Sequence, residues 1–326
     1  MFDIRLIIRE IMKIIYHCFG GTHSSIVAAA LHLGWLPREH LPSAAEIQAI
    51  PYFDQRRRGE EGEIKFLGRD SYGHEIYAVG KRGMGTLLEN FLYDLAEALK
   101  LPRGELLLLD TTPLVNCWMA LGGFLSRRLG LTFLGRPLVT WGVKRAYPSL
   151  VSLVETLSPL RVSSFPVELS PREKPSRLLI FTSSRTLALA LAAATLYLRV
   201  SAGSPLEYLD EYPRENTFWK KKPGQLLFVG EDPYGLKVYA TAIGPYFNLL
   251  HQIVEGFLSL WGLDKDSVRL IKVDRYASPL THLGSLLHLP WVFHWGLRRS
   301  YSHFSKLISE VKLDAGSKIS DNGSEK

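Results

Sequence analysis

The chain has 326 residues, of which 46% are hydrophobic and 22% are charged. This length favours two domains, each large enough to bury a core, and this balance of residue types argues against extended disorder. The formal net charge of +7 is compatible with anionic partners. The basic residues occur in short scattered runs, however, so the sequence gives no indication of nucleic-acid binding.

Cysteine content and the N-terminus bear on the compartment. Cys18 and Cys117 are too few for a disulfide framework and lack zinc-ribbon spacing, which favours a reducing, cytoplasmic compartment. The first 11 residues carry charges within their apolar stretch and lack the apolar core of a signal peptide. The first convincing strand begins at Lys13, directly after Met12, so Met12 is an alternative candidate for the start, and the sequence leaves the choice open.

The apolar run from Leu178 to Leu198 is long enough to cross a bilayer as a helix. Arg185 stands near its middle beside several hydroxyl-bearing residues, and a charge at that depth is costly. We therefore expect no membrane span, and an internal repeat explains the run better.

That repeat consists of three colinear blocks. Residues 13–33 align with residues 177–197 at an offset of 164 (177 − 13), which superimposes two Ala triplets. The later blocks are FLGRDSYGHEIYA with FVGEDPYGLKVYA, and WGVKRAY with WGLRRSY. Because the period is a whole domain, the sequence predicts two tandem diverged copies of one α/β domain rather than an array of small repeats.

A proline-rich segment between the copies is typical of an exposed linker. The end of the chain loses apolar periodicity, which is typical of a disordered tail. We therefore predict a first domain at 1–158, a linker at 159–176, a second domain at 177–312 and a tail at 313–326.

Apolar spacing predicts the elements of the first copy. In chain order these are a strand at 13–18, a helix at 24–34, a hairpin of strands at 64–68 and 75–79, a helix at 87–99, a strand at 106–109, a helix at 113–129, an extended segment at 137–141 and a helix at 148–157. Asp110 ends the fourth strand, and Asp274 is expected to hold the equivalent position in the second copy. Each copy is thus predicted to be a three-layer α/β unit.

The residues from His17 to Ser25 join the first strand to the first helix. A helix N-terminus presents unpaired amides and a dipole that favour an anion, and glycines allow close backbone approach. The candidate ligand-binding residues are His17, Gly20, Gly21, Thr22, Ser24 and Ser25. The Walker pattern lacks its Lys, which disfavours ordinary ATP hydrolysis. We expect a phosphate-bearing small molecule or nucleotide as ligand, and the sequence identifies no cofactor.

Three residues are candidates for catalysis at this loop. A helix N-terminus favours the thiolate of Cys18, which makes Cys18 the candidate nucleophile. His23 is a candidate donor to a developing oxyanion if it is protonated, and Asp110 a candidate proton donor. The reaction expected is phosphoryl transfer or hydrolysis.

Alternatives remain open at this stage. Cys18 suits a buried strand end, and Ser24 and Ser25 suit helix N-caps. Arg127 follows a Gly-Gly segment and could face the anion, but a solvated helix end is the favoured interpretation. A metal site of two histidines and the thiol is a weaker option. The competing hypothesis for the whole chain is a non-catalytic duplicated scaffold that binds another protein.

The loop resembles the phosphate loop of low-molecular-weight protein tyrosine phosphatases. In that loop a strand ends in Cys, five residues follow, and Arg-Ser opens a helix. Here five residues separate Cys18 from Ser24 and Ser25. The resemblance implies phosphoryl chemistry on Cys18, but the Arg that clamps the phosphoryl oxygens is absent from the loop.

A wider resemblance covers nearly the whole of each copy. The run from Tyr16 to Gly34 and the segment from Gly122 to Gly142 are similar to the bacterial family catalogued as domain of unknown function 3189, found mainly in spore-forming and related Firmicutes. The resemblance implies this fold unit in a bacterial cytoplasmic protein, without an established activity. In the second copy, 182–187 replaces 18–23, so the site is predicted in the first copy alone.

Overall fold

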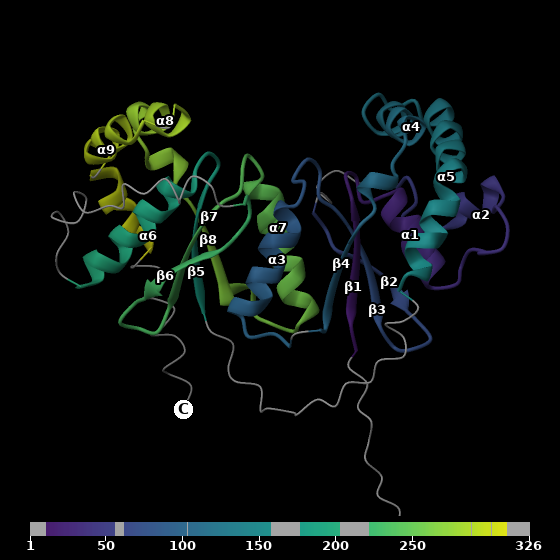
Figure 1. Cartoon of the computed structure of the whole chain (residues 1–326), viewed down its shortest axis with the longest axis horizontal. Helices are drawn as coiled ribbons and strands as arrows, with labels where there is room; N and C mark the ends of the chain where they lie inside the picture. The colour runs from purple at the N-terminus through teal and green to yellow at the C-terminus, as the bar shows by residue number, and fades with distance from the viewer. Residues whose placement is uncertain are drawn as a thin grey trace, which may run out of the picture. The chain divides into compact units, whose positions relative to one another are not determined.

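The computed structural model contains two four-stranded sheets, one in each half of the chain (Figure 1). The residues that it describes are 11–55, 62–102, 104–157, 177–202, 222–287, 289–300 and 302–311. The prediction of two α/β copies is therefore confirmed. The predicted linker at 159–176 and tail at 313–326 lie outside the described residues, so the domain limits stay predictions.

The first sheet has the strand order β2-β3-β1-β4. β1 (Lys13–Cys18) is central and pairs in parallel with β3 (Glu75–Gly80) and with β4 (Leu106–Asp110). β2 (Lys65–Arg69) pairs antiparallel with β3, as expected for the predicted hairpin. Because the three parallel strands run the same way, the residues that end them lie at one edge of the sheet.

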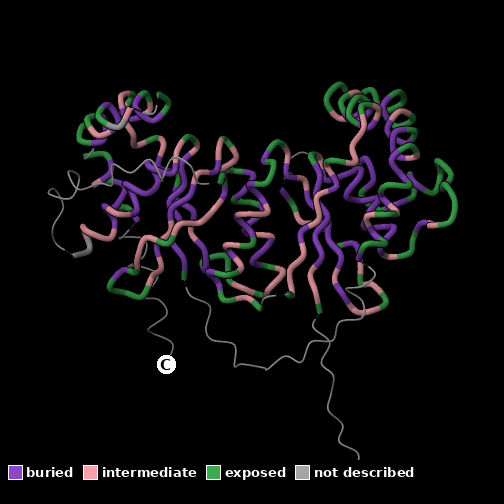
Figure 2. Tube along the Cα trace, in the orientation of Figure 1, coloured by how far each residue is buried: buried purple, intermediate pink, exposed green. Residues whose placement is uncertain are grey.

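Helices α1 (Ser24–His32), α2 (Ala44–Ala49) and α5 (Thr132–Glu155) cover one face of this sheet (Figure 1). All nine residues of α1 are buried, because its small side chains allow it to pack closely on β1, β3 and α5 (Figure 2). Before α5, helix α4 (Cys117–Arg127) follows a short 3-10 turn. The chain divides into two compact units that differ slightly from the two copies. Helix α3 (Leu87–Ala98) belongs to the first copy in sequence but to the compact unit that contains most of the second copy.

The second copy has the same topology, with strand order β6-β7-β5-β8. Its strands are β5 (Leu178–Ser183), β6 (Leu227–Glu231), β7 (Lys237–Ala242) and β8 (Val268–Lys272). Its helices are α6 (Leu187–Ala202), α7 (Phe247–Leu260), α8 (Pro279–Leu286) and α9 (Pro290–Arg299), with a further helical stretch at 302–311. None of the helices that the structure describes is long and apolar enough to cross a membrane.

Two predictions about individual elements were wrong or incomplete. The segment 137–141 was predicted to be extended, but α5 continues through it and contains both Pro137 and Pro148. A Cβ added at Gly122 would lie 2.6–2.7 Å from backbone atoms of α5, so α4 and α5 approach closely there. This tertiary packing outweighs the helix-breaking tendency of proline. Helix α2 was not predicted, although Ser43 and its capping box are a usual start signal.

The strand registers correct the predicted equivalence of Asp110 and Asp274. His17 lies opposite Asp110 in the first sheet, whereas Thr182 lies opposite Lys272 in the second. Lys272 therefore occupies the position of Asp110. The offset between the strands is 165 (182 − 17), while the Ala triplets align at 164, so the second strand-to-helix loop is one residue shorter. The offset between β4 and β8 is 162 (272 − 110), two less than the offset of the Ala triplets, so the equivalent predicted from the triplets was displaced by two residues.

We predict that α1 tolerates no larger side chain. Ala29 is fully buried between the sheet and α5, so Ala29→Leu should destabilise the protein by about 1–3 kcal/mol through overpacking. Ala45 is exposed on α2, and Ala45→Leu should change stability by no more than about 0.5 kcal/mol. Thermal unfolding of the two variants measures the difference. Equal melting temperatures would contradict the packing described for α1.

Candidate functional site

The loop between β1 and α1 consists of five residues, from Phe19 to His23. Its path is set by close contact with Gly80, the last residue of β3. Gly21 has a φ of +66°, and a Cβ at this position would lie 2.8 Å from the Gly80 Cα. A Cβ at Gly80 would in turn lie 2.9 Å from the backbone of Gly20. Since no side chain fits at either position, glycine holds the loop against the neighbouring strand.

Cys18 lies beneath this loop and is 3% exposed. Its Sγ accepts a hydrogen bond from the Gly21 amide at 3.1 Å and lies 3.3 Å from the Ser25 Oγ. Burial raises the pKa of the Cys18 thiol, but hydrogen bonds from Ser25, Ser24 and Gly21 outweigh it, so the pKa lies below its ordinary value. The site therefore favours a thiolate.

Backbone donors surround the thiol. His23 is the N-cap residue of α1, and no side chain caps this helix. Within the described part of the chain, the amides of Gly20, Thr22, His23 and Ser24 have no hydrogen-bond acceptor. These amides and the dipole of α1 favour negative charge at the loop.

The two serines do not act as N-caps, contrary to the structural alternative. Ser24 and Ser25 lie inside the first turn of α1. The Ser24 Oγ lies 2.9 Å from the Thr111 Oγ1, which also donates to the His17 carbonyl. The Ser25 hydroxyl instead contacts Cys18. Ser24 therefore connects the loop to the segment after β4, and Ser25 stabilises the thiolate.

His23 does not supply positive charge. Its Nε2 lies 3.0 Å from the Asp54 Oδ1, and Ser126 and Arg136 also donate to the Asp54 carboxylate. Burial lowers the pKa of His23 more than Asp54 raises it, so the imidazole is neutral at neutral pH. Despite burial, hydrogen bonds from His23 and Ser126 hold the pKa of Asp54 below its ordinary value. An ionised carboxylate only accepts, so the His23 Nε2 carries the proton.

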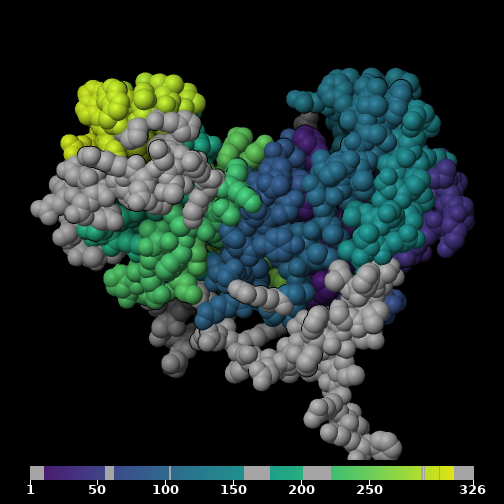
Figure 3. Space-filling model, viewed as in Figure 1, coloured from purple at the N-terminus to yellow at the C-terminus, as the bar shows by residue number. Residues whose placement is uncertain are grey.

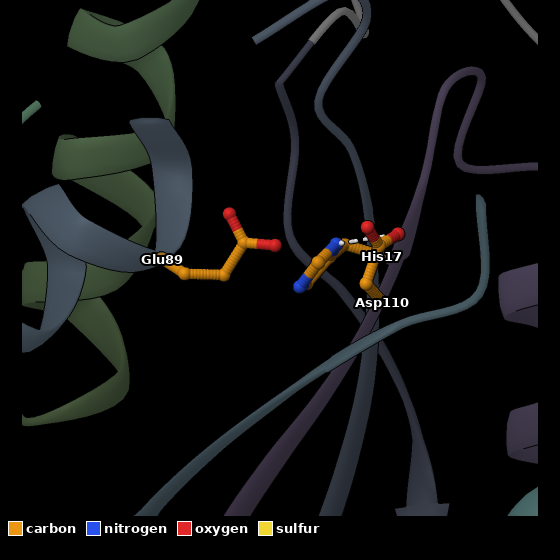
Figure 4. Close-up of side chains that lie close together, drawn as sticks. All are labelled: His17, Glu89 and Asp110. Atoms are coloured by element: carbon orange, nitrogen blue, oxygen red, sulfur yellow. Dashed lines mark ion pairs between the residues drawn. The ribbon is translucent and has the colours of Figure 1, made fainter. Parts of the chain in front are cut away.

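His17 and Asp110 form a separate group at the strand ends. Figure 4 shows the His17 ring beside the Asp110 carboxylate, with 3.5 Å between Nδ1 and Oδ1. The Lys81 Nζ lies 2.8 Å from the same carboxylate. Burial raises the pKa of Asp110, but His17, Lys81 and Thr112 together hold it well below its usual range. An ionised carboxylate of this kind disfavours the predicted proton-donor role. Glu89, also drawn in Figure 4, belongs to α3.

The structure therefore brings together some predicted residues and separates others. Cys18, the loop glycines and the two serines converge. His17, Cys18 and His23 have different partners, which gives no support to a metal site made from these three. The residues that sequence analysis missed or discounted are Asp54, Lys81 and Arg127. The position of Lys81 just after a predicted strand was a weak signal that it lies at the site. No sequence feature near Asp54 indicated its contacts with the loop.

Arg127, at the end of α4, lies on the loop rather than in solvent. Its NH1 group donates to the Thr22 Oγ1 at 2.6 Å, and its Nε lies 3.5 Å from the Gly123 carbonyl oxygen. Figure 3 shows α4 and α5 projecting together from the first copy. The favoured interpretation of Arg127 as a solvated helix end was thus wrong.

The corresponding loop of the second copy holds a carboxylate of the protein itself. Asp274 accepts hydrogen bonds from the Ser184 amide at 3.0 Å and from the Ser184 hydroxyl at 2.8 Å. The Ser183 Oγ lies 3.1 Å from the same carboxylate and accepts from the amides of Arg185 and Thr186. Ser183 thus stands at the position of Cys18. In this copy the strand-to-helix loop binds an anion, and that anion is internal.

We predict that Asp274 stabilises the second copy through these bonds. Asp274→Ala removes the acceptor of one amide and two hydroxyls, and should destabilise by about 1–3 kcal/mol. Asp274→Asn keeps the shape of the side chain and one acceptor oxygen, so it should destabilise the protein less than Asp274→Ala does. Thermal unfolding distinguishes the variants. Melting temperatures equal to that of the parent for both would mean that the carboxylate contributes nothing to the loop.

Comparison with known proteins adds one finding. No curated protein and no solved structure matches the chain. The family model described as "Protein of unknown function (DUF3189)" matches residues 13–158 and again residues 179–313. These ranges coincide with the two copies and cover well over half of the sequence. The chain therefore belongs to this family, as two tandem members in one polypeptide.

Proposed function

We propose that the first copy binds a phosphate-bearing small molecule at the loop from Cys18 to Ser25 and hydrolyses or transfers its phosphoryl group. The observation that carries this proposal is a thiol whose pKa is lowered, beneath a glycine loop in which four backbone amides have no acceptor among the residues that the structure describes. The carboxylate held by the matching loop of the second copy supports an anion as the ligand.

The chemistry proposed is nucleophilic attack by Cys18. The Sγ lone pair forms a bond to phosphorus while the bond from phosphorus to the ester oxygen breaks, and that oxygen leaves with the electron pair and takes a proton from solvent. Water then attacks the phosphorus, the S–P bond breaks, and the electron pair returns to Sγ. The water proton passes to solvent, and phosphate is released. The loop amides stabilise the oxygens in both steps.

The resemblance to the low-molecular-weight phosphatase loop supports the same assignment. Cys18 and Ser25 correspond to the Cys and the Ser that end and follow that loop, and in this chain the two side chains are 3.3 Å apart. The departure is Ser24, which stands where that loop has Arg. Because Asp110 is held ionised, an ester whose leaving group departs without a proton is the suitable first substrate.

We predict that Cys18→Ser abolishes turnover of p-nitrophenyl phosphate, because a hydroxyl is a far weaker nucleophile than a thiolate at neutral pH. The loss should be at least about 100-fold in kcat. The matched control is Cys117→Ser, which changes the exposed cysteine at the start of α4 and should retain parent turnover. Release of p-nitrophenolate measures all three proteins.

Ligand binding is measured separately by thermal shift with inorganic phosphate and a panel of nucleotides. Phosphate at 100 times its Kd should stabilise the parent by about 2.7 kcal/mol. Equal turnover in the parent and in Cys18→Ser would eliminate the thiol mechanism while leaving binding intact. Absence of any shift with every anion would eliminate the ligand.

The second candidate function is a non-catalytic module that binds another protein. Large exposed apolar side chains on α5 and α9 favour this function. Phe133 of α5 is 72% exposed, and Trp291 of α9 is 70% exposed. Such residues are enriched at protein interfaces. This function gains support if no anion shifts the melting temperature of the parent.

A further inference from the structure

The loop from Gly20 to Thr22 lies beside a guanidinium group from another part of the fold. Arg127 ends α4, more than 100 residues after the loop, and donates to the Thr22 Oγ1 at 2.6 Å. The side chain is neither buried nor fully exposed, so a ligand at the loop can reach it. Its Nε lies near the Gly123 carbonyl of its own helix, which orients the fork toward the loop.

Gly20 makes this position available. A Cβ at Gly20 would lie 2.7 Å from the Arg127 NH2 and 3.0 Å from its Cζ. Any other residue would therefore have to displace the guanidinium. The absence of a side chain at Gly20 and the location of Arg127 are two parts of one arrangement, in which a cation lies directly on the loop backbone.

The electrostatics of the surrounding residues agree with a cation at this point. The charge of Arg127 is close enough to lower the pKa of both His23 and Asp54. The Asp54 carboxylate is engaged by His23, Ser126 and Arg136. The bonds that Arg127 donates to the neutral oxygens of Thr22 and Gly123 are weaker than a bond to an anionic oxygen.

The second copy lacks the same cation. Asn116 caps α4 and Ser278 caps α8, which gives an offset of 162 (278 − 116) for this helix. Helix α8 ends at Leu286, three residues before the number that this offset gives for Arg127, and it contains no arginine. The copy whose cysteine is replaced by Ser183 thus also lacks the arginine, and its loop holds Asp274. The first copy has both the thiol and the arginine that ends α4, whereas the second copy has neither at the corresponding positions and carries Arg185 within its loop instead.

We propose that Arg127 supplies the phosphoryl clamp that the loop itself lacks, and that it selects dianionic phosphate monoesters. This inference rests on the proposed function of the loop. A guanidinium binds two nonbridging oxygens at once, whereas the loop amides approach from the backbone side. A monoester presents three such oxygens and two charges. A diester presents two oxygens and one charge, so the guanidinium and the loop amides must share the same two oxygens and only half the charge is available to them.

The test compares Arg127→Lys and Arg127→Met with the same changes at Arg128, the exposed neighbour at the end of α4. The probes are inorganic phosphate for binding, and p-nitrophenyl phosphate and bis(p-nitrophenyl) phosphate for turnover. Arg127→Met should lower kcat/KM for the monoester by at least about 100-fold, with a loss in kcat, because the clamp acts on charge developing in the transition state. Arg127→Lys should retain part of the activity, and the Arg128 variants should match the parent.

The two substrates distinguish a clamp from a structural role. A merely structural Arg127 would lose monoester and diester turnover in equal proportion, whereas the clamp predicts a fall in the monoester-to-diester ratio. Arg127→Lys keeps the length and the charge of the side chain, so its turnover of the two substrates still tests the proposal if Arg127→Met fails to fold. An active parent together with Arg127 variants whose kcat/KM for the monoester equals that of the parent would overturn the role of Arg127. A parent that neither binds phosphate nor turns over ester would overturn the proposed function itself.

Discussion

The constraint on which the site depends is the contact between two backbones at Gly21 and Gly80. The central strand and its parallel neighbour end side by side, and the loop after the first must turn immediately above the end of the second. Neither position has room for a Cβ. This contact sets the direction in which the chain enters α1. It also brings the Gly21 amide and the Ser25 hydroxyl to the Cys18 sulfur, which lowers the pKa of the thiol despite its burial.

The two copies show how one framework supports two different polar arrangements. The strand order and the strand registers recur in both copies. So does a close glycine contact between two helices, which joins α4 to α5 in the first copy and α8 to α9 in the second. Around the loop, Ser183 and Lys272 take the positions of Cys18 and Asp110, and α8 contains no counterpart of Arg127. An internal carboxylate satisfies the loop of the second copy, so that copy keeps the geometry without a thiol. The apolar frame therefore determines the fold, and a few residues at one sheet edge determine whether a loop is left with open donors.

The sequence predicted the strands, the hairpin, α1 and the repeat, because each depends on local apolar spacing or on similarity between the copies. It also predicted where the loop between β1 and α1 lies, since the glycines and hydroxyl-bearing residues stand between an apolar strand and an apolar helix. Arg127 could not be assigned from the sequence, because its contact with Thr22 depends on how α4 packs. The same holds for Asp54, whose carboxylate contacts His23, 31 residues earlier in the chain, and Ser126, 72 residues later. Proline spacing misled the prediction of α5, where tertiary packing decides.

The most direct measurement of the central claim is a titration of the ¹⁵N-labelled protein with inorganic phosphate, followed by amide NMR shifts. If the first loop is the anion site, the amides of Gly20, Thr22, His23 and Ser24 should move together with one dissociation constant, because they are the donors available to the anion. The amides of Ser184 to Thr186 should stay in place, since Asp274 and Ser183 already accept from them. Unchanged amides in the first loop at saturating phosphate, or equal movement in both loops, would contradict the account.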